Sequence, residues 1–308
     1  MKPMDVLRDF PVRKSRKQKQ AFRETVCAFG EQLGYACAVE KGRFGVHNLV
    51  LGDPEKAKYL ITAHYDTCAR LPVPNLLTPC SFWPFLGYQI FLCAFMLAVP
   101  LAPWLVVKVV TDSFGYAWIA WYLCFWVELF LLFCGPANRT NANDNTSGVV
   151  TVLEIAATLP ENLRDRVCFV LFDLEELGML GSGAYASAHK QAVKGQLVLN
   201  LDCVGEGDHI RLFPTKKLKK DLRKLKPLHS ICGDLGKKNI QIREKGFAAF
   251  PSDQMSFPYG VGICALNQSK VGLYLSRIHT GRDTILEQTN VNILRAALIT
   301  LIGRSAVQ

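Results

Sequence analysis

Residues 58–67 read KYLITAHYDT, and this stretch decides the class of fold. Its first part is mostly apolar, as in a buried strand, and it ends in His64, with Asp66 two residues later. RVCFVLFD at 166–173 and GQLVLNLD at 195–202 have the same form. Amphipathic helical patterns accompany these strands at 17–33, 148–159, 183–190 and 291–306. This alternation predicts a mostly parallel sheet covered by helices on both faces.

Polar residues follow the predicted strands, at the edge where such sheets bind ligands. The motifs, in chain order, are AHYDT (63–67), NANDNTSG (141–148), FDLEELGMLGS (172–182), LNLDCVG (199–205) and IHTGRDT (278–284). Their histidines and carboxylates suit a divalent metal that prefers nitrogen and oxygen, and no cysteine is expected at a suitable place. Five ligands exceed what one catalytic zinc uses, so the set indicates two metals with a bridging carboxylate and a remaining Glu as base.

Each motif alone is weak, because an adjacent Glu pair is usually a solvated surface and an Asp after a strand is often a helix cap. Their joint order carries the interpretation. In that order they resemble the co-catalytic zinc exopeptidases of the aminopeptidase S and aminopeptidase Y type, metallopeptidase family twenty-eight, which includes glutamate carboxypeptidase II-like and glutaminyl-cyclase-like members. The resemblance covers residues 59–290 apart from an insertion. It implies a three-layer α/β/α sandwich with a mixed, mostly parallel sheet, and hydrolysis of N-terminal peptide bonds of short peptides.

The resemblance also implies a role for each matching residue. It implies five ligands for two Zn²⁺ per chain: His64 and Asp202 on one ion, Glu176 and His279 on the other, and Asp144 between them. Glu175 would be the general base, and Asp66 would lie behind His64 to fix its tautomer. The segment at 251–257 resembles the family's Ser-Asp-His pattern, but Gln254 stands in place of the histidine. Any role for that position is therefore in doubt.

A long apolar insertion separates the first two motifs. No charged residue occurs between Arg70 and Lys108, and the stretches 81–107 and 113–137 are each long enough to cross a membrane. Pro100 and Pro103 would kink the first stretch, and Glu128 lies within the second. We expect residues 1–78 and 138–308 to form the catalytic domain. Residues 79–137 would then form either a transmembrane or re-entrant hairpin, or an apolar lid or dimerisation arm.

Charge and cysteine usage bear on location. The formal net charge is +10, and nearly all Lys and Arg lie outside the apolar insertion, so the positive-inside tendency predicts that the catalytic domain faces the cytoplasm. No secretory signal is found at the start. The 11 cysteines are scattered without a Cys-x-x-Cys pair, which makes a disulfide framework unexpected and favours a reducing compartment.

Three alternatives remain open at this stage. The basic segment 216–226, KKLKKDLRKLK, is either a helix on anionic lipid or a solvated helix with one buried leucine stripe, and no nucleic-acid partner is expected. The alternative enzyme is a glutaminyl-cyclase-like aminoacyltransferase, which would use one zinc at the Asp144, Glu176 and His279 positions. The chain could also be a catalytically silent membrane-bound scaffold. The oligomeric state and the preferred substrate side chain do not follow from the sequence.

Overall fold

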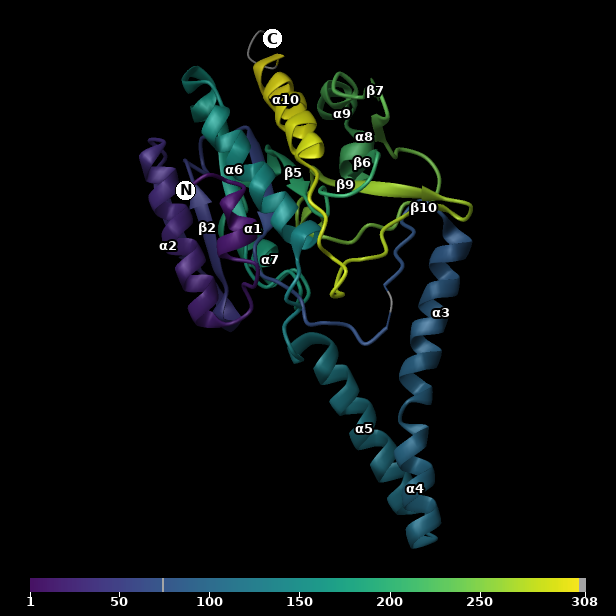
Figure 1. Cartoon of the computed structure of the whole chain (residues 1–308). Coiled ribbons are helices and arrows are strands. Elements are labelled where there is room, and N and C mark those ends of the chain that lie inside the picture. The colour runs from purple at the N-terminus through teal and green to yellow at the C-terminus, as the bar shows by residue number, and fades with distance from the viewer. Residues whose placement is uncertain (74, 305–308) are drawn as a thin grey trace.

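The computed structural model describes residues 1–73 and 75–304. Its centre is a ten-stranded mixed sheet with the order β1-β2-β4-β3-β5-β9-β6-β8-β7, and β10 pairs with β9 (Figure 1). The strands are β1 Cys37–Lys41, β2 His47–Leu51, β3 Tyr59–His64, β4 Val167–Phe172, β5 Leu197–Leu201, β6 His209–Pro214, β7 Gly233–Leu235, β8 Lys238–Ile242, β9 Gly260–Ser269 and β10 Gly272–Tyr274.

The middle of the sheet is parallel. β3 pairs in parallel with β4 and β5, and β5 pairs in parallel with β9, whereas the pairs towards both edges include antiparallel ones. Every residue of β3, β4 and β5 is buried, which is why these strands are nearly continuous apolar runs. The predicted mixed, mostly parallel sheet is thereby confirmed.

Helices cover both faces of this sheet. They are α1 Asp5–Asp9, α2 Arg16–Gln32, α6 Gly148–Thr158, α7 Leu180–Ala188, α8 Lys216–Lys220, α9 Leu222–His229 and α10 Gln288–Arg304. On one face, Phe22 of α2, Leu153 of α6 and Leu298 of α10 belong to one buried cluster. On the other, Tyr185 of α7 packs edge-on against Phe172 of β4. The predicted helix 291–306 is confirmed in its described part, and residues 305 and 306 lie outside the described residues.

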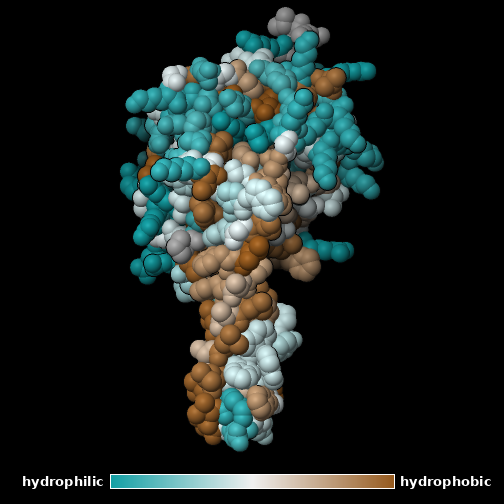
Figure 2. All heavy atoms as spheres, turned by 90° about the vertical axis from the view of Figure 1, so that its right-hand side faces the viewer, coloured by the Kyte–Doolittle hydropathy of each residue, from teal (hydrophilic) through white to brown (hydrophobic). Residues whose placement is uncertain are grey.

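The insertion, residues 79–137, projects from this domain, and we call it the arm and the remainder the head. It consists of α3 Phe82–Ala98, α4 Leu101–Thr111 and α5 Phe114–Cys134, with α4 packed against α5 at the far tip (Figure 1). Two spans, Phe82–Thr111 and Phe114–Cys134, are long and apolar enough to cross a membrane, and only 6% of the most apolar window of each is buried. Figure 2 shows an apolar arm under a hydrophilic head.

Where the chain returns from the arm, it pairs with the segment that follows β3, and we call this pairing the neck. Ala69 and Ala137 form an isolated antiparallel bridge. On either side of it, the Arg70 backbone N–H donates to the Pro136 carbonyl at 2.9 Å, and the Asn138 N–H donates to the Cys68 carbonyl at 3.1 Å. The chain therefore returns from α5 beside the segment that follows β3, whereas it leaves the head for α3 near β10, where Leu77 pairs with Leu275 (Figure 1).

The N-terminal part of the head contains one disulfide, which joins Cys27 of α2 to Cys37 of β1. The sequence offers no spacing signal for this pair, and we expected no disulfide framework. The bridge forms because α2 packs along the sheet edge and brings the two residues together from across a short loop. This single bridge links one helix to the edge of the sheet, and it does not form a framework of several disulfides.

The basic segment 216–226 is not one helix. Asp221 separates α8 from α9 and caps α9 by accepting a hydrogen bond from the Lys224 backbone N–H. Leu218 and Leu225 are buried, whereas Leu222 is exposed. In Figure 1 both helices lie at the end of the head away from the arm tip, so they do not share a lipid surface with the arm. The geometry favours the solvated-helix interpretation.

Candidate metal centre

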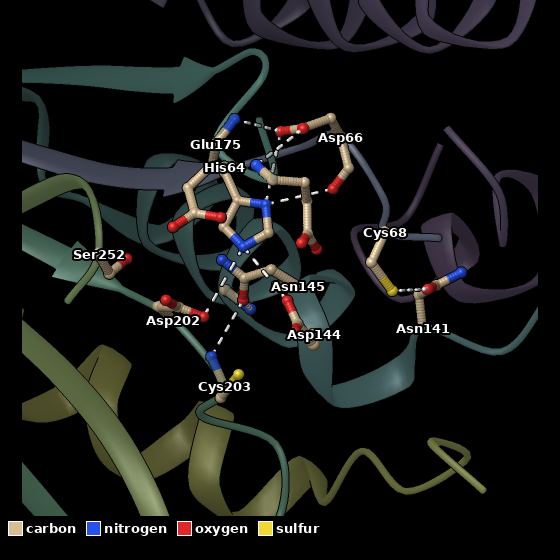
Figure 3. A network of polar contacts seen from close by, with 12 residues as sticks. His64, Asp66, Cys68, Asn141, Asp144, Asn145, Glu175, Asp202, Cys203 and Ser252 are labelled. Carbon is tan, nitrogen blue, oxygen red and sulfur yellow. Dashed lines mark hydrogen bonds and ion pairs between the residues drawn. The ribbon is translucent and has the colours of Figure 1, made fainter. Parts of the chain in front are cut away.

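The carboxyl edge of the parallel strands brings the five sequence motifs together. His64 ends β3, the Glu175–Glu176 pair follows β4, and Asp202 follows β5. Asp144 lies in the turn Ala142–Ser147 before α6, and His279 lies in the loop between β10 and α10. Figure 3 shows His64 between Asp144, Asp202 and Glu175.

Asp144 occupies the middle of the cluster and uses its two oxygens on opposite sides. Its Oδ1 lies 3.3 Å from His64 Nε2, and its Oδ2 lies 2.9 Å from His279 Nε2. Each imidazole faces a second carboxylate: Asp202 Oδ1 is 3.7 Å from His64 Nε2, and Glu176 Oε2 is 3.4 Å from His279 Nε2. The five residues expected as ligands thus form two groups that share Asp144.

Each group contains an oxygen that no protein group satisfies. Asp202 Oδ1 and Glu176 Oε1 are buried and have no hydrogen-bond partner within residues 1–73 and 75–304. A buried carboxylate oxygen without a partner is costly, and a bound cation is a group that would satisfy it. The donor set of imidazole nitrogens and carboxylate oxygens is one that zinc accepts. The residues present therefore fit two zinc ions.

The electrostatics of the cluster point the same way. Burial alone would lower the pKa of His64, but the charge of Glu175 and the hydrogen bond with Asp144 raise it well above its ordinary value. Burial alone would raise the pKa of Asp144, but hydrogen bonds with His279 and His64 hold it below its usual range. The carboxylates thus draw positive charge onto the imidazoles, and divalent cations supply such charge more strongly.

Asp66 connects the His64 strand to the Glu pair. Its carboxylate accepts backbone N–H hydrogen bonds from Glu175 at 3.1 Å and from Glu176 at 3.2 Å. His64 Nδ1 lies 3.2 Å from the Asp66 backbone carbonyl and 3.5 Å from its carboxylate. The nearer partner of the ring is thus the carbonyl, while the carboxylate fixes the backbone that presents the two glutamates. We keep the role of Asp66 in setting the His64 tautomer as a prediction.

The sequence did not predict two residues, Asp283 and Arg13, that hydrogen-bond to the turn carrying Asp144. Asp283 accepts hydrogen bonds from the backbone N–H groups of Asn143 at 2.7 Å and Asp144 at 3.0 Å, which fixes the turn that carries Asp144. Its position within the quoted motif IHTGRDT was the available signal. Arg13 is fully buried and donates to Thr146 Oγ1 at 3.1 Å. Nothing in its basic surroundings in the sequence distinguishes it from a surface arginine.

Gln254 takes no part in the centre. Its Nε2 donates to the Phe250 carbonyl at 2.7 Å, and its Oε1 accepts a hydrogen bond from Asn200 at 3.3 Å. Both ends of the side chain are therefore engaged in the head interior. Its neighbour Asp253 is fully buried, and its charge adds to the burial that raises the pKa of Glu175.

One expectation about the centre was wrong. No cysteine was expected at a suitable place, yet the structure brings Cys68 to the centre. Its sulfur, one nitrogen of His279 and one carboxylate oxygen of Glu176 all lie within 4.8 Å of one another. Cys68 follows Asp66 by two residues, but its approach to His279 depends on how the loops converge, which the sequence pattern does not reveal.

A cavity opens beside the centre towards the base of the arm. It has a volume of about 240 Å³. Its lining includes Asp66 and Glu176 of the centre together with Phe133 and Cys134 from the end of α5. The arm therefore borders the approach to the cluster.

Comparison with known proteins agrees with the motifs. The sequence profile described as "Peptidase family M28" matches residues 117–301. Aminopeptidase YwaD of Bacillus subtilis (strain 168) is 40% identical over 67 residues, a stretch that is 21% of this chain and 15% of that protein. The matched part is thus a small fraction of the relative's length.

Solved structures show the same fold at low sequence identity. The glutaminyl cyclase of Porphyromonas gingivalis has a TM-score of 0.61 at 17% identity and covers 98% of this chain and 96% of that one. A Zn-dependent exopeptidase from Parabacteroides distasonis has a TM-score of 0.59 at 16% identity, with coverage of 95% and 92%. The LapA aminopeptidase of Legionella pneumophila has a TM-score of 0.58 at 15% identity, with coverage of 97% and 68%.

Proposed function

The chain belongs to peptidase family M28, and from this premise we propose that it is a two-zinc aminopeptidase that hydrolyses the N-terminal peptide bond of short peptides. Members of this family are zinc-dependent metallo-exopeptidases, so a peptide substrate and zinc follow from membership. The number of ions, the exopeptidase type and the roles of individual residues belong to the proposal.

One observation carries the proposal. The two oxygens of Asp144 face different histidines, and each histidine faces a further carboxylate that has an unsatisfied buried oxygen. Such an arrangement suits a carboxylate that bridges two metals. We therefore assign His64 and Asp202 to the first zinc, Glu176 and His279 to the second, and Asp144 to both.

When bound, the zinc ions would polarise the scissile carbonyl and lower the pKa of the attacking water. Glu175 is not needed as a ligand in this arrangement and acts as general base: it accepts a proton from the attacking water and later donates it to the leaving amine. Burial raises the pKa of Glu175 well above its ordinary value, which suits a group that must take up and release a proton. Asp66 holds the Glu175 backbone in place for this transfer.

Glutaminyl cyclase is the alternative within the same fold, and the likeness to the Porphyromonas enzyme supports it. Such an enzyme would use one zinc at Asp144, Glu176 and His279. The residues assigned to the first zinc favour the two-metal peptidase. His64 and Asp202 lie next to each other beside Asp144, and Asp202 Oδ1 lacks a hydrogen-bond partner among the described residues. A silent scaffold would need neither the ligand set nor Glu175.

The test uses the full-length protein purified in detergent and loaded with zinc. We expect about two zinc ions per chain and hydrolysis of aminoacyl-anilides, with a Glu175→Gln rate lower by about 10²- to 10⁴-fold because the general base is lost. Glu24→Gln, at an exposed position on α2, is the matched control and should leave the rate unchanged. One zinc per chain with cyclisation of N-terminal glutamine would favour the alternative. Equal rates for wild type and Glu175→Gln would reject the mechanism.

We also propose that the arm, residues 79–137, anchors the head, residues 1–78 and 138–308, to a membrane, with the head in the cytoplasm. The exposed apolar surface of the arm supports anchoring, and the Lys and Arg of the head support this orientation. Protease added to intact cells should then leave the head uncut. Cleavage of the head in intact cells would place it on the opposite side. A detergent-free soluble dimer would instead make the arm a dimerisation element.

A further inference from the structure

We call His64, Asp144 and Asp202 the first metal group, and Asp144, Glu176 and His279 the second. The second metal group has a potential sulfur ligand, Cys68, that was not among the ligands expected from the sequence motifs. Cys68 is 1% exposed, and its side chain reaches the centre from the loop after β3. The same loop begins with His64 at the first metal group, so it serves both groups (Figure 3). Asp66, between them, hydrogen-bonds to the backbone of the Glu pair.

The distances suit a shared ion. Zinc binds thiolate sulfur at about 2.3 Å and nitrogen or oxygen at about 2.0–2.2 Å, so two donors on one zinc lie at most about 4.4 Å apart when sulfur is one of them. The Cys68 sulfur, a Glu176 oxygen and a His279 nitrogen lie within 4.8 Å of one another without any ion to draw them together. These three donors thus lie close to the separation that one shared zinc requires.

Neither Glu176 Oε1 nor the Cys68 sulfur makes a strong interaction that zinc binding would have to break. The buried Oε1 of Glu176 has no partner in the described part of the chain. The Cys68 thiol donates a hydrogen bond of 3.5 Å to Asn141 Oδ1, and Figure 3 shows its sulfur directed there. Losing this bond costs little, because thiols are weak donors. The Nδ2 of Asn141 keeps its own bonds to the Pro11 and Asn138 carbonyls, so the residue stays in position.

We infer that Cys68 is a ligand of the second zinc, which it binds together with Asp144, Glu176 and His279. The inference rests on the proposed two-metal function and deepens it. On binding, the sulfur–zinc bond forms and the thiol proton leaves to solvent. Cys68 would add a sulfur donor to the nitrogen of His279 and the carboxylate oxygens of Glu176 and Asp144. A thiolate also disfavours magnesium and manganese, which prefer oxygen, so Cys68 makes the second site selective for zinc.

Cobalt substitution tests this, because it reports on the ligand directly and not on activity. Metal-free full-length protein in detergent is titrated with Co²⁺, whose visible bands report binding and whose near-ultraviolet thiolate-to-cobalt band reports sulfur ligation. We expect the near-ultraviolet band in wild type to saturate with one cobalt per chain. It should be absent in Cys68→Ala, in which visible bands persist and the second ion binds about 10- to 100-fold more weakly or worse.

Cys203→Ala is the matched control, since Cys203 is a buried cysteine next to the first-site ligand Asp202 and belongs to none of the donor groups found among the described residues. It should keep the near-ultraviolet band. If Cys68→Ala does not fold, Cys68→Ser gives the same readout. Visible bands without a near-ultraviolet band in wild type would overturn the inference and leave the two-metal proposal standing. Failure to bind cobalt at all would overturn both.

Discussion

Two apolar helices that follow one another in the chain have opposite surroundings. α5, in the arm, has 21 residues and buries only Ala117. α6, in the head, has 11 residues, and most of them are buried between the sheet and α10. Both are rich in large apolar side chains. In the head the apolar side chains of α6 are covered, whereas the apolar surface of α5 is left exposed, so it requires another environment.

The largest test of this contrast is to place charge on the arm. Leu123→Arg with Val127→Arg puts two charges on one exposed side of α5, where each costs about 2.5–3.5 kcal/mol at the centre of a membrane helix. We expect the variant to move from the carbonate-resistant membrane fraction to the extractable one. Leu222→Arg, at an exposed position of the head, should stay in the membrane fraction. Unchanged membrane retention of the double variant would show that α5 does not lie in lipid.

Ion pairs give the second test. Lys19 Nζ lies 2.7 Å from Asp173 Oδ1, and the two side chains are 9% and 0% exposed. Lys19→Met leaves a buried carboxylate without its cation, so we expect the free energy of unfolding to fall by about 3–5 kcal/mol. Lys108→Met at the arm tip is the comparison, because its partner Asp112 is 96% exposed, and it should cost less than about 1 kcal/mol. Denaturant melts of both variants in detergent decide whether the two pairs differ.

A third test compares one residue type in the two helices. Leu153 of α6 is fully buried, and Leu153→Ala should cost about 2–5 kcal/mol through lost burial and the cavity left behind. Leu123 of α5 is 60% exposed, and Leu123→Ala should change stability in detergent by no more than about 0.5 kcal/mol. Similar losses at both positions would mean that α5 is packed in a way the structure does not show.

The smallest expected effect concerns pH. His189, at the end of α7, lies 2.7 Å from Glu55 and 3.0 Å from Glu40. Partial burial alone would lower the pKa of His189, but these carboxylates outweigh it and raise the pKa. A raised folded-state pKa adds stability that is present below the ordinary His value near 6.5 and is lost as pH rises through the folded value.

The His189→Gln variant should therefore melt below wild type at acidic pH, and the difference should disappear above the raised pKa. Thermal melts at a series of pH values measure this. A difference that is independent of pH would contradict an electrostatic origin.

The centre of the sheet and the five expected metal ligands could be predicted because both produce recognisable patterns over short stretches of sequence. Each central strand is a nearly continuous apolar run, and each polar residue of the cluster except His279 follows such a run or lies just before a helix. β1 produces no such pattern, since most of its residues are exposed or half-buried. Arg13 and Cys68 depend on contacts between segments far apart in the sequence, and the Cys27–Cys37 pair depends on how α2 packs. Short-range patterns contain no information about such contacts.

The neck at Ala69 and Ala137 has a practical consequence. Because these two residues already pair as in a β-hairpin, a tight turn joining them would close the chain without stretching the head. Such a shortened protein would lose the contacts of residues 71–78, including the hydrogen bond from the Leu71 N–H to the His279 carbonyl at 2.9 Å. It would nevertheless keep the pairing at the neck. The neck is thus a place at which engineering could replace residues 70–136 with a different tether.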